Sequence, residues 1–323
     1  MPFSAKFLES ASKEYEVSTI AADFEIATAY IKKAVAAAAK LNPNIAAKNV
    51  DIYIHGSYAN KTNIWFPSNL EICVELKRTP NWEPSVQSTL TPEPKKLPAN
   101  FALQYRLHND YFVDHNLDFS PKAFRELLFI ALSEATGEKC IENGKAILIP
   151  CFGKLKHVIE ITPCFSFDYH EPVDNGGVFK GVLLYDASVR ADIITFPRLH
   201  AQNGNTKDLR CGGNFKKCVR LFKTINAILA REFDIKPERG YFIECLLFNV
   251  PNQIFKGKDL AEVFLKVINY LANCDTEDFV CQNTIWHLFG TAAEFWTLPA
   301  AHAFIKLMRE NFKTFPASRT LLA

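Results

Sequence analysis

Apolar residues recur every three or four positions along two long segments, which is the pattern of an amphipathic helix. The first segment covers residues 19–41 and ends before Pro43, which cannot continue a helix. The second begins at Ser120-Pro121, a cap followed by a proline in the first turn, and continues to Thr136. A shorter helix is expected over residues 5–15.

Alternating apolar and polar residues, many of them β-branched, predict strands over the first two thirds of the chain. The Asn143-Gly144 pair is a hairpin signal between two of them. The predicted strands are residues 50–54, 70–77, 138–142, 145–149, 157–165, 181–185 and 192–196. Gly56-Ser57 turns the chain after the first strand, and a short helix is expected over residues 58–63.

Residues 78–99 contain five prolines and little periodicity, so they predict a surface loop. The loop is either a lid near the candidate site or an ordinary insertion. Residues 100–110 are expected to be helical, and residues 197–204 to form a loop.

The chain changes character at Gly212-Gly213, beyond which the pattern is helical almost throughout. Asn214 is a candidate cap for the first helix of this part. The predicted helices are residues 214–232, 239–248, 258–273, 276–289 and 299–312. We therefore expect an α+β protein, with a mixed-sheet domain over residues 1–205 and a helical domain over residues 206–323.

Charge and cysteine content narrow the class of protein. The 37 basic and 35 acidic residues leave a net charge of +2, whereas a nucleic-acid-binding domain usually shows a strong basic excess. None of the nine cysteines forms a Cys-x-x-Cys pair, so free thiols in a reducing compartment are expected and a zinc site is not. No charged leader precedes an apolar stretch, and no apolar run approaches ~18 residues, so we expect a soluble cytoplasmic protein without a membrane partner.

Candidate chemistry gathers around the first two strands. Gly56-Ser57 follows the first strand, and Asn69 and Glu71 open the second. Residues two apart in a strand point to the same face, so these two side chains would lie together. A third polar position is Glu160, an acid in an otherwise apolar strand, where burial is costly unless the acid is paired or metal-bound. Acids in this arrangement hold Mg²⁺ ions in phosphoryl transfer, and a glycine-serine turn can hold phosphate.

Four stretches resemble the cGAS/DncV-like nucleotidyltransferases, the bacterial CD-NTases, and most closely their clade E. They begin at Gly56 (GSYANKTNI), Glu160 (EITPCF), Gly213 (GNFKKCVRLFK) and Tyr241 (YFIECLLFNVP). They resemble, in order, the family's nucleotide-binding segment, its third-acid strand, its spine helix and its "SYxIECLLYNVP" helix. Their order and spacing fit along nearly the whole chain.

The resemblance implies a bilobed protein with a polymerase-β-like core and an OAS-like helical domain. It implies Mg²⁺- or Mn²⁺-dependent joining of NTPs such as ATP into a cyclic di- or trinucleotide, with release of pyrophosphate. The product would activate an effector protein in bacterial anti-phage (CBASS) signalling.

Site residues also carry over from the resemblance. Gly56 and Ser57 would hold the donor triphosphate, and Lys223 would reach it from the spine helix. Tyr241 would stack on a base. The metal ligands, and hence the catalytic residues, would be Asn69, Glu71 and Glu160. The lysine completes a basic stripe with Lys216 and Arg220, which either faces solvent or binds the ligand.

Two positions depart from the family pattern. Asn69 replaces an aspartate, and an amide oxygen carries no charge for Mg²⁺. Gly240 stands where the family often has serine. Three explanations for Asn69 are open: an engineered substitution, a natural nucleotide-binding protein without turnover, or an enzyme for which Glu71 and Glu160 suffice. A nucleotidyltransferase acting on another acceptor is a further alternative.

Overall fold

The structure is a computed structural model of the chain. It describes residues 5–13, 20–42, 45, 47–64, 69–77, 120–137, 140–170, 178–290 and 296–312. The proline-rich stretch 78–99 and the expected helix 100–110 lie outside the described residues.

Helices and strands are mixed along the chain up to Thr195, and the elements after it are all helical, as the sequence pattern predicts. The helices are α1 (Ala5–Ser12), α2 (Ile20–Leu41), α3 (Gly56–Asn60), α5 (Pro121–Thr136), α6 (Pro197–Arg210), α7 (Asn214–Glu232), α8 (Gly240–Phe248), α9 (Leu260–Leu271) and α10 (Leu298–Phe312), with 3-10 turns η1 (Ala47–Asn49) and η3 (Asn252–Phe255). The strands are β1 (Val50–Ile54), β2 (Leu70–Leu76), β3 (Ile141–Asn143), β4 (Ala146–Ile149), β5 (Ile159–His170), β6 (Val178–Asp186) and β7 (Ala191–Thr195).

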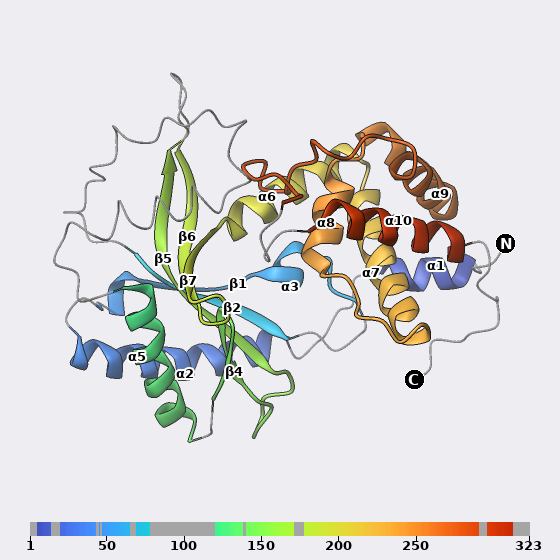
Figure 1. The fold of residues 1–323 in the computed structure, drawn as a ribbon. Coiled ribbons are helices and arrows are strands. Elements are labelled where there is room, and N and C mark those ends of the chain that lie inside the picture. Colours follow the sequence, from blue (N-terminus) through green and yellow to red (C-terminus); the bar gives the residue numbers. More distant parts are fainter. Residues whose placement is uncertain are drawn as a thin grey trace. The chain divides into compact units, whose positions relative to one another are not determined.

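Within the described residues the strands form one mixed sheet, confirming the α+β class. The order is β1-β2-β5-β4-β3, and β6 and β7 continue from the second half of β5 (Figure 1). The pairing of β2 with β5 is parallel, and the other pairings are antiparallel. Strands β2 and β5 therefore run in the same direction, and the side chains at their first residues lie at the same edge of the sheet.

One face of the sheet is the apolar core. Helices α2 and α5 lie along it (Figure 1), and the buried side chains of Ile31, Leu128 and Ile72 belong to the same cluster. Because side chains alternate along a strand, the residues between the core positions of β1, β2 and β5 point to the opposite face. That opposite face carries the polar candidates.

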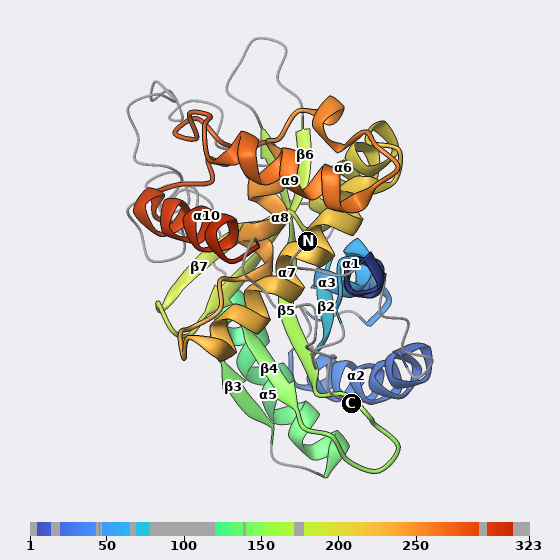
Figure 2. The ribbon, with the colours of Figure 1, turned by 90° about the vertical axis from the view of Figure 1, so that its right-hand side faces the viewer.

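The chain divides into two compact units. One unit combines residues 16–59 and 68–199, and the other combines residues 1–15, 60–67 and 200–323. The main division thus falls after residue 199, within the first turn of α6. The boundary predicted from the sequence, at residue 205, lies in the same helix. The N-terminal segment joins the helical unit because α1 packs on α7 (Figure 2).

Helix α7 is the centre of the helical unit, and α1, α8, α9 and α10 all contact it (Figure 2). Its Phe222 is fully buried and its ring centroid lies 4.6 Å from that of Phe264 on α9. The helix has the predicted bounds, but Gly213 occupies the cap position. Asn214 is instead the first helical residue, and its Nδ2 donates to the carbonyls of Phe255 (2.8 Å) and Gly257 (3.0 Å).

Two predictions of secondary structure are wrong. Residues 197–204 are not a loop but the start of α6, with Pro197 in the first turn. Residues 276–289 are not a helix but turns with isolated bridges. Asn283 causes this, because its Oδ1 accepts from the backbone amides of Ile285 (3.0 Å) and Trp286 (3.1 Å) and offers the backbone an alternative to helix.

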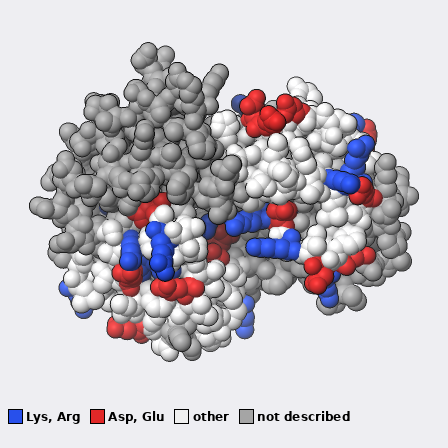
Figure 3. Space-filling model, in the orientation of Figure 1, with Lys and Arg blue, Asp and Glu red and all other residues white. Residues whose placement is uncertain are grey.

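The distribution of charged side chains agrees with the near-neutral net charge of the sequence. In the view of Figure 3 the basic and acidic side chains of the described residues lie beside one another. No helix among the described residues is both long enough and apolar enough to cross a membrane. The nine cysteines are free thiols.

Candidate active site on the polar face of the sheet

Glu71 and Glu160 are direct register partners on the parallel strands β2 and β5. Both alternate with core residues, so both side chains leave the sheet on its polar face. Both are half-buried, and the Glu71 side chain keeps 29% of its surface exposed. The sequence placed these acids 89 positions apart, and the parallel pairing brings them side by side.

Asn69 lies immediately before β2 and joins the same group. Its Nδ2 donates a hydrogen bond to Glu160 Oε2 over 3.2 Å. The three polar positions suggested by the sequence therefore lie together at the start of two neighbouring strands. Because the amide is neutral, it avoids the repulsion that a third carboxylate at this position would create.

The Gly56-Ser57 turn lies against this group. Gly56 has φ +66°, in the left-handed region that favours glycine, and begins α3 directly. A Cβ atom on Gly56 would fall 2.1 Å from Glu71 Oε1 and 2.5 Å from Oε2. The absence of a side chain at Gly56 therefore leaves the space that the Glu71 carboxylate occupies. Ser57 follows, half-buried, in the first turn of α3.

His55 links the turn to the strand acids. Its backbone amide donates to the Glu71 carbonyl (3.0 Å), and its Nδ1 lies 3.8 Å from Glu71 Oε2. Burial lowers the pKa of His55, but the neighbouring Cys73 and Glu71 more than offset that effect, so the pKa lies above its ordinary value. The side chain is thus a packed neighbour of the Glu71 carboxylate.

A further acid on the same face is engaged elsewhere. Glu75 accepts a hydrogen bond from Ser166 Oγ (2.6 Å), and its Oε2 lies 3.1 Å from a guanidinium nitrogen of Arg198. The guanidinium also stacks over the ring of Tyr53, 4.1 Å from the centroid. Glu75 is thus a paired structural acid, which separates it from Glu71 and Glu160.

In the helical unit, the carboxylate of Glu244 on α8 collects donors from three other segments. Asn60 Nδ2 donates to Oε2 over 3.0 Å, Thr62 Oγ1 donates to Oε1 over 2.6 Å, and His200 Nε2 lies 2.7 Å from Oε2. Lys223 Nζ on α7 forms an ion pair with Oε1. The glutamate is 3% exposed, so this is a fully buried charge whose partners satisfy it.

The charge state of Glu244 follows from these partners. Burial by itself raises the pKa of the carboxyl, but the charge of Lys223 and the hydrogen bond of His200 outweigh burial. The pKa of Glu244 therefore lies well below its ordinary value, and the carboxylate stays ionised at neutral pH.

Known proteins resemble the chain in both sequence and fold. The family model described as "cGAS/DncV-like nucleotidyltransferase C-terminal helical domain" matches residues 202–313. The cyclic UMP-AMP synthase of Rhodothermus marinus is 27% identical over 266 residues, covering 80% of this chain and 83% of that protein. The chain is thus similar to the cGAS/DncV-like nucleotidyltransferases over four fifths of its length, and residues 202–313 match their helical domain.

Two further matches agree with this similarity, one in sequence and one in fold. A cyclic nucleotide synthase of Staphylococcus haemolyticus, CdnE01, is 28% identical over 81% of this chain and 84% of its own length. The structure of the Rhodothermus marinus CdnE c-UMP-AMP synthase with Apcpp and Upnpp superposes with a TM-score of 0.71 at 22% identity, covering the whole of both chains. The polymerase-β-like fold and the clade E resemblance expected from the sequence are confirmed.

The candidate site suits Mg²⁺ in the chemistry of its donors. Mg²⁺ in proteins is commonly held by one or two carboxylates together with substrate phosphates. Glu71 and Glu160 supply two carboxylates. The Asn69 amide points its nitrogen at Glu160, and a rotation of the amide would place its oxygen there instead. The described residues contain no group of three His, Cys, Asp or Glu side chains placed for a metal, because the third position is this amide.

Two carried-over residues lie in surroundings that the sequence did not indicate. Lys223 Nζ is buried between Glu244 and Thr62, whose Oγ1 it reaches over 3.1 Å. A Cβ atom at Gly240 would lie 2.9 Å from Lys223 Cε, so the glycine that departs from the family pattern leaves room for the lysine. Tyr241 stacks on His200, with ring centroids 5.2 Å apart.

The basic stripe on α7 is not solvated, because Lys216, Arg220 and Lys223 are all buried. Sequence reasoning also missed Glu244 as the partner of one of them. The signal was available, since Glu244 is an acid inside the apolar run of the Tyr241 stretch. The same reasoning that singled out Glu160 in its strand applies to Glu244 in its helix.

The contact between Gly56 and Glu71 makes a direct prediction. Gly56→Ala is expected to displace the Glu71 carboxylate and to reduce nucleotide turnover at least about a hundredfold, an effect that corresponds to losing about 2.7 kcal/mol of transition-state stabilisation. Gly137→Ala is the matched control, because Gly137 has the same φ of +66° and open space around its Cβ position. Both variants strain a left-handed backbone position, and only Gly56→Ala adds a clash, so its loss of stability in urea unfolding should be at least as large. Equal activities of the two variants would contradict the assigned contact.

Proposed function

We propose that this chain joins nucleoside triphosphates into a cyclic di- or trinucleotide and releases pyrophosphate. The observation that supports this most strongly is the register pairing of Glu71 with Glu160 beside the Gly56-Ser57 turn. The names of the curated relatives, which are cyclic nucleotide synthases, support the same reaction.

In this proposal each residue of the site has a defined task. Gly56 and Ser57 hold the triphosphate of the donor nucleotide, and Glu71 and Glu160 hold Mg²⁺ or Mn²⁺ with the oxygen of Asn69. When bound, such a metal activates the attacking hydroxyl and neutralises charge on the leaving pyrophosphate. His55 positions Glu71 through its backbone and ring contacts.

The helical unit contributes through Tyr241, whose residue surface is 41% exposed while one ring face rests on His200. A base can stack on the remaining ring surface at low cost, because the His200 contact already fixes the ring. Lys223 approaches phosphate only by leaving Glu244, so we assign it first to the fold of the helical unit and second to the triphosphate.

A second candidate function is nucleotide binding without turnover. The hydrogen bond from Asn69 to Glu160 favours it, since the amide occupies a carboxylate oxygen and brings no charge of its own. Under either function the product or the bound nucleotide would act on an effector protein, and for the synthase we place this in bacterial anti-phage signalling in the cytoplasm.

Radiolabelled NTPs with Mg²⁺ or Mn²⁺ separate the two candidates. The synthase is expected to give a phosphatase-resistant product, and Glu71→Gln and Glu160→Gln are expected to abolish it while retaining the fold, because each swap is isosteric. Glu262→Gln on the exposed side of α9 is the matched control and should keep full activity. Tight NTP binding without product, also after Asn69→Asp, would favour the binding protein and overturn the synthase.

A further inference from the structure

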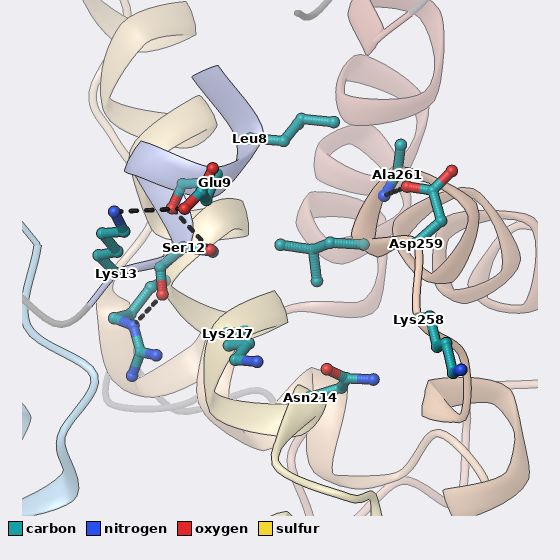
Figure 4. Close-up of a pocket in the computed structure, with 11 residues that line it drawn as sticks. Leu8, Glu9, Ser12, Lys13, Asn214, Lys217, Lys258, Asp259 and Ala261 are labelled. Carbon is teal, nitrogen blue, oxygen red and sulfur yellow. Dashed lines mark hydrogen bonds and ion pairs between the residues drawn. The ribbon is translucent and has the colours of Figure 1, made fainter. Parts of the chain in front are cut away.

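A separate pocket lies inside the helical unit, between α1, the first turns of α7 and the start of α9 (Figure 4). Its volume is about 540 Å³, which is within the range of small-molecule sites. None of its lining residues belongs to the catalytic group or to the Glu244 network. The residues used below are Leu8, Lys13, Lys217, Arg220, Lys258 and Leu260.

The floor of the pocket is preformed. Leu8 is 3% exposed and Arg220 is 7% exposed. Arg220 Nε donates to the carbonyl of Ser12 over 2.6 Å, and another of its nitrogens donates to the carbonyl of Lys61, so the guanidinium is fixed. The floor therefore combines an apolar patch with one immobile positive charge.

The rim is positively charged. Four basic and two acidic side chains line the pocket, which leaves an excess of two positive charges. The acids are already engaged: Glu9 pairs with Lys13 (3.3 Å), and Asp259 caps α9 by accepting from the amide of Ala261 (2.9 Å). Lys217 and Lys258 have no acidic partner among the described residues, and Figure 4 shows both at the lower edge of the pocket.

Two unneutralised ammonium groups at one cavity raise its positive potential and attract a compact anion. Lysine is a common phosphate ligand, and a buried arginine adds a fixed charge beneath it. The apolar side chains of Leu8 and Leu260 would meet an organic group attached to the phosphate. We infer that this pocket binds a small organic phosphate, with the phosphate on Lys217 and Lys258 and the organic group over the apolar floor.

Phenyl phosphate and inorganic phosphate are suitable probes, measured by calorimetry on the full chain without nucleotide. Phenyl phosphate is expected to bind at least about fivefold more tightly, because its ring buries apolar area. The variant with Lys217→Ala and Lys258→Ala is expected to weaken phenyl phosphate binding about tenfold or more. The variant with Leu8→Ser is expected to remove the preference for the phenyl group.

The matched control carries Lys266→Ala and Lys306→Ala, which remove the same charge from exposed ion pairs on α9 and α10 outside the pocket. Its affinity should change less than twofold, as charge effects at that range are screened. Equal losses in the two double variants, no loss in either, or no phenyl phosphate binding up to the millimolar range would each overturn the site. Because Lys217 and Lys258 are exposed, their removal leaves the fold intact, and thermal unfolding checks this.

Discussion

Asn69→Asp is expected to raise the rate of NTP turnover by at least about tenfold, which corresponds to about 1.4 kcal/mol of transition-state stabilisation. The reason is that the change converts a neutral amide at the Glu160 carboxylate into a third charged oxygen ligand. Initial rates of pyrophosphate release with saturating NTP and Mg²⁺ would measure it.

The same variant has a signature that does not depend on activity. Without a divalent metal, the new carboxylate replaces a hydrogen bond with like-charge repulsion against Glu160, so Asn69→Asp should unfold at a lower temperature than the unaltered chain. Added Mg²⁺ should restore or reverse the difference. Asn269→Asp on the exposed face of α9 is the matched control and should show neither effect. If Mg²⁺ changed neither the rate of pyrophosphate release nor the unfolding temperature of Asn69→Asp, the metal assignment would be contradicted.

Glu244→Ala is expected to destabilise the chain by about 3–5 kcal/mol, because it leaves Lys223 as a buried charge without its partner. Chemical denaturation would measure the loss. Glu262→Ala is the matched control: its ion pair with Lys266 is exposed, so its removal should cost about 0–1 kcal/mol. The double variant with Lys223→Ala and Glu244→Ala should be more stable than the sum of the single losses predicts, and strict additivity would contradict the buried pair.

The lowered pKa of Glu244 adds a pH dependence with a defined sign. A carboxyl whose folded pKa lies below its ordinary value of 4.5 stabilises the fold fully above that value. The contribution is lost as the pH falls through the lowered folded pKa. The stability gap between the unaltered chain and Glu244→Ala should therefore shrink below a pH of about 4.5 and stay constant near neutrality.

Local signals predicted much of the fold. The bounds of β1 and α5 follow from a short β-branched run and from the Ser120-Pro121 start, where Ser120 Oγ accepts from the Ala123 amide over 3.2 Å. The sequence failed at residues 276–289, where side-chain oxygens compete with helical hydrogen bonds. It also failed at α6, because the polar composition and the internal Gly204 are not typical of a helix. Gly204 stands there because a Cβ atom would lie 2.5 Å from Gln282 Nε2.

The sequence names the members of the candidate site but not their arrangement. Alternation places Glu71 and Glu160 on the sheet surface, but nothing local to either strand indicates the parallel register that makes them neighbours. The ion pair of Lys223 with Glu244 likewise depends on the packing of α7 against α8. A residue pattern along one element cannot specify a partner on another, and so Lys223 was expected at phosphate alone.

The mass of the reaction product tests the central claim most directly. The chain would be incubated with all four NTPs and Mg²⁺, treated with phosphatase, and analysed by mass spectrometry. A cyclic di- or trinucleotide that is absent with Glu71→Gln is the predicted result. Only nucleosides and linear species from both the unaltered chain and Asn69→Asp would contradict the proposal that this site makes cyclic nucleotides.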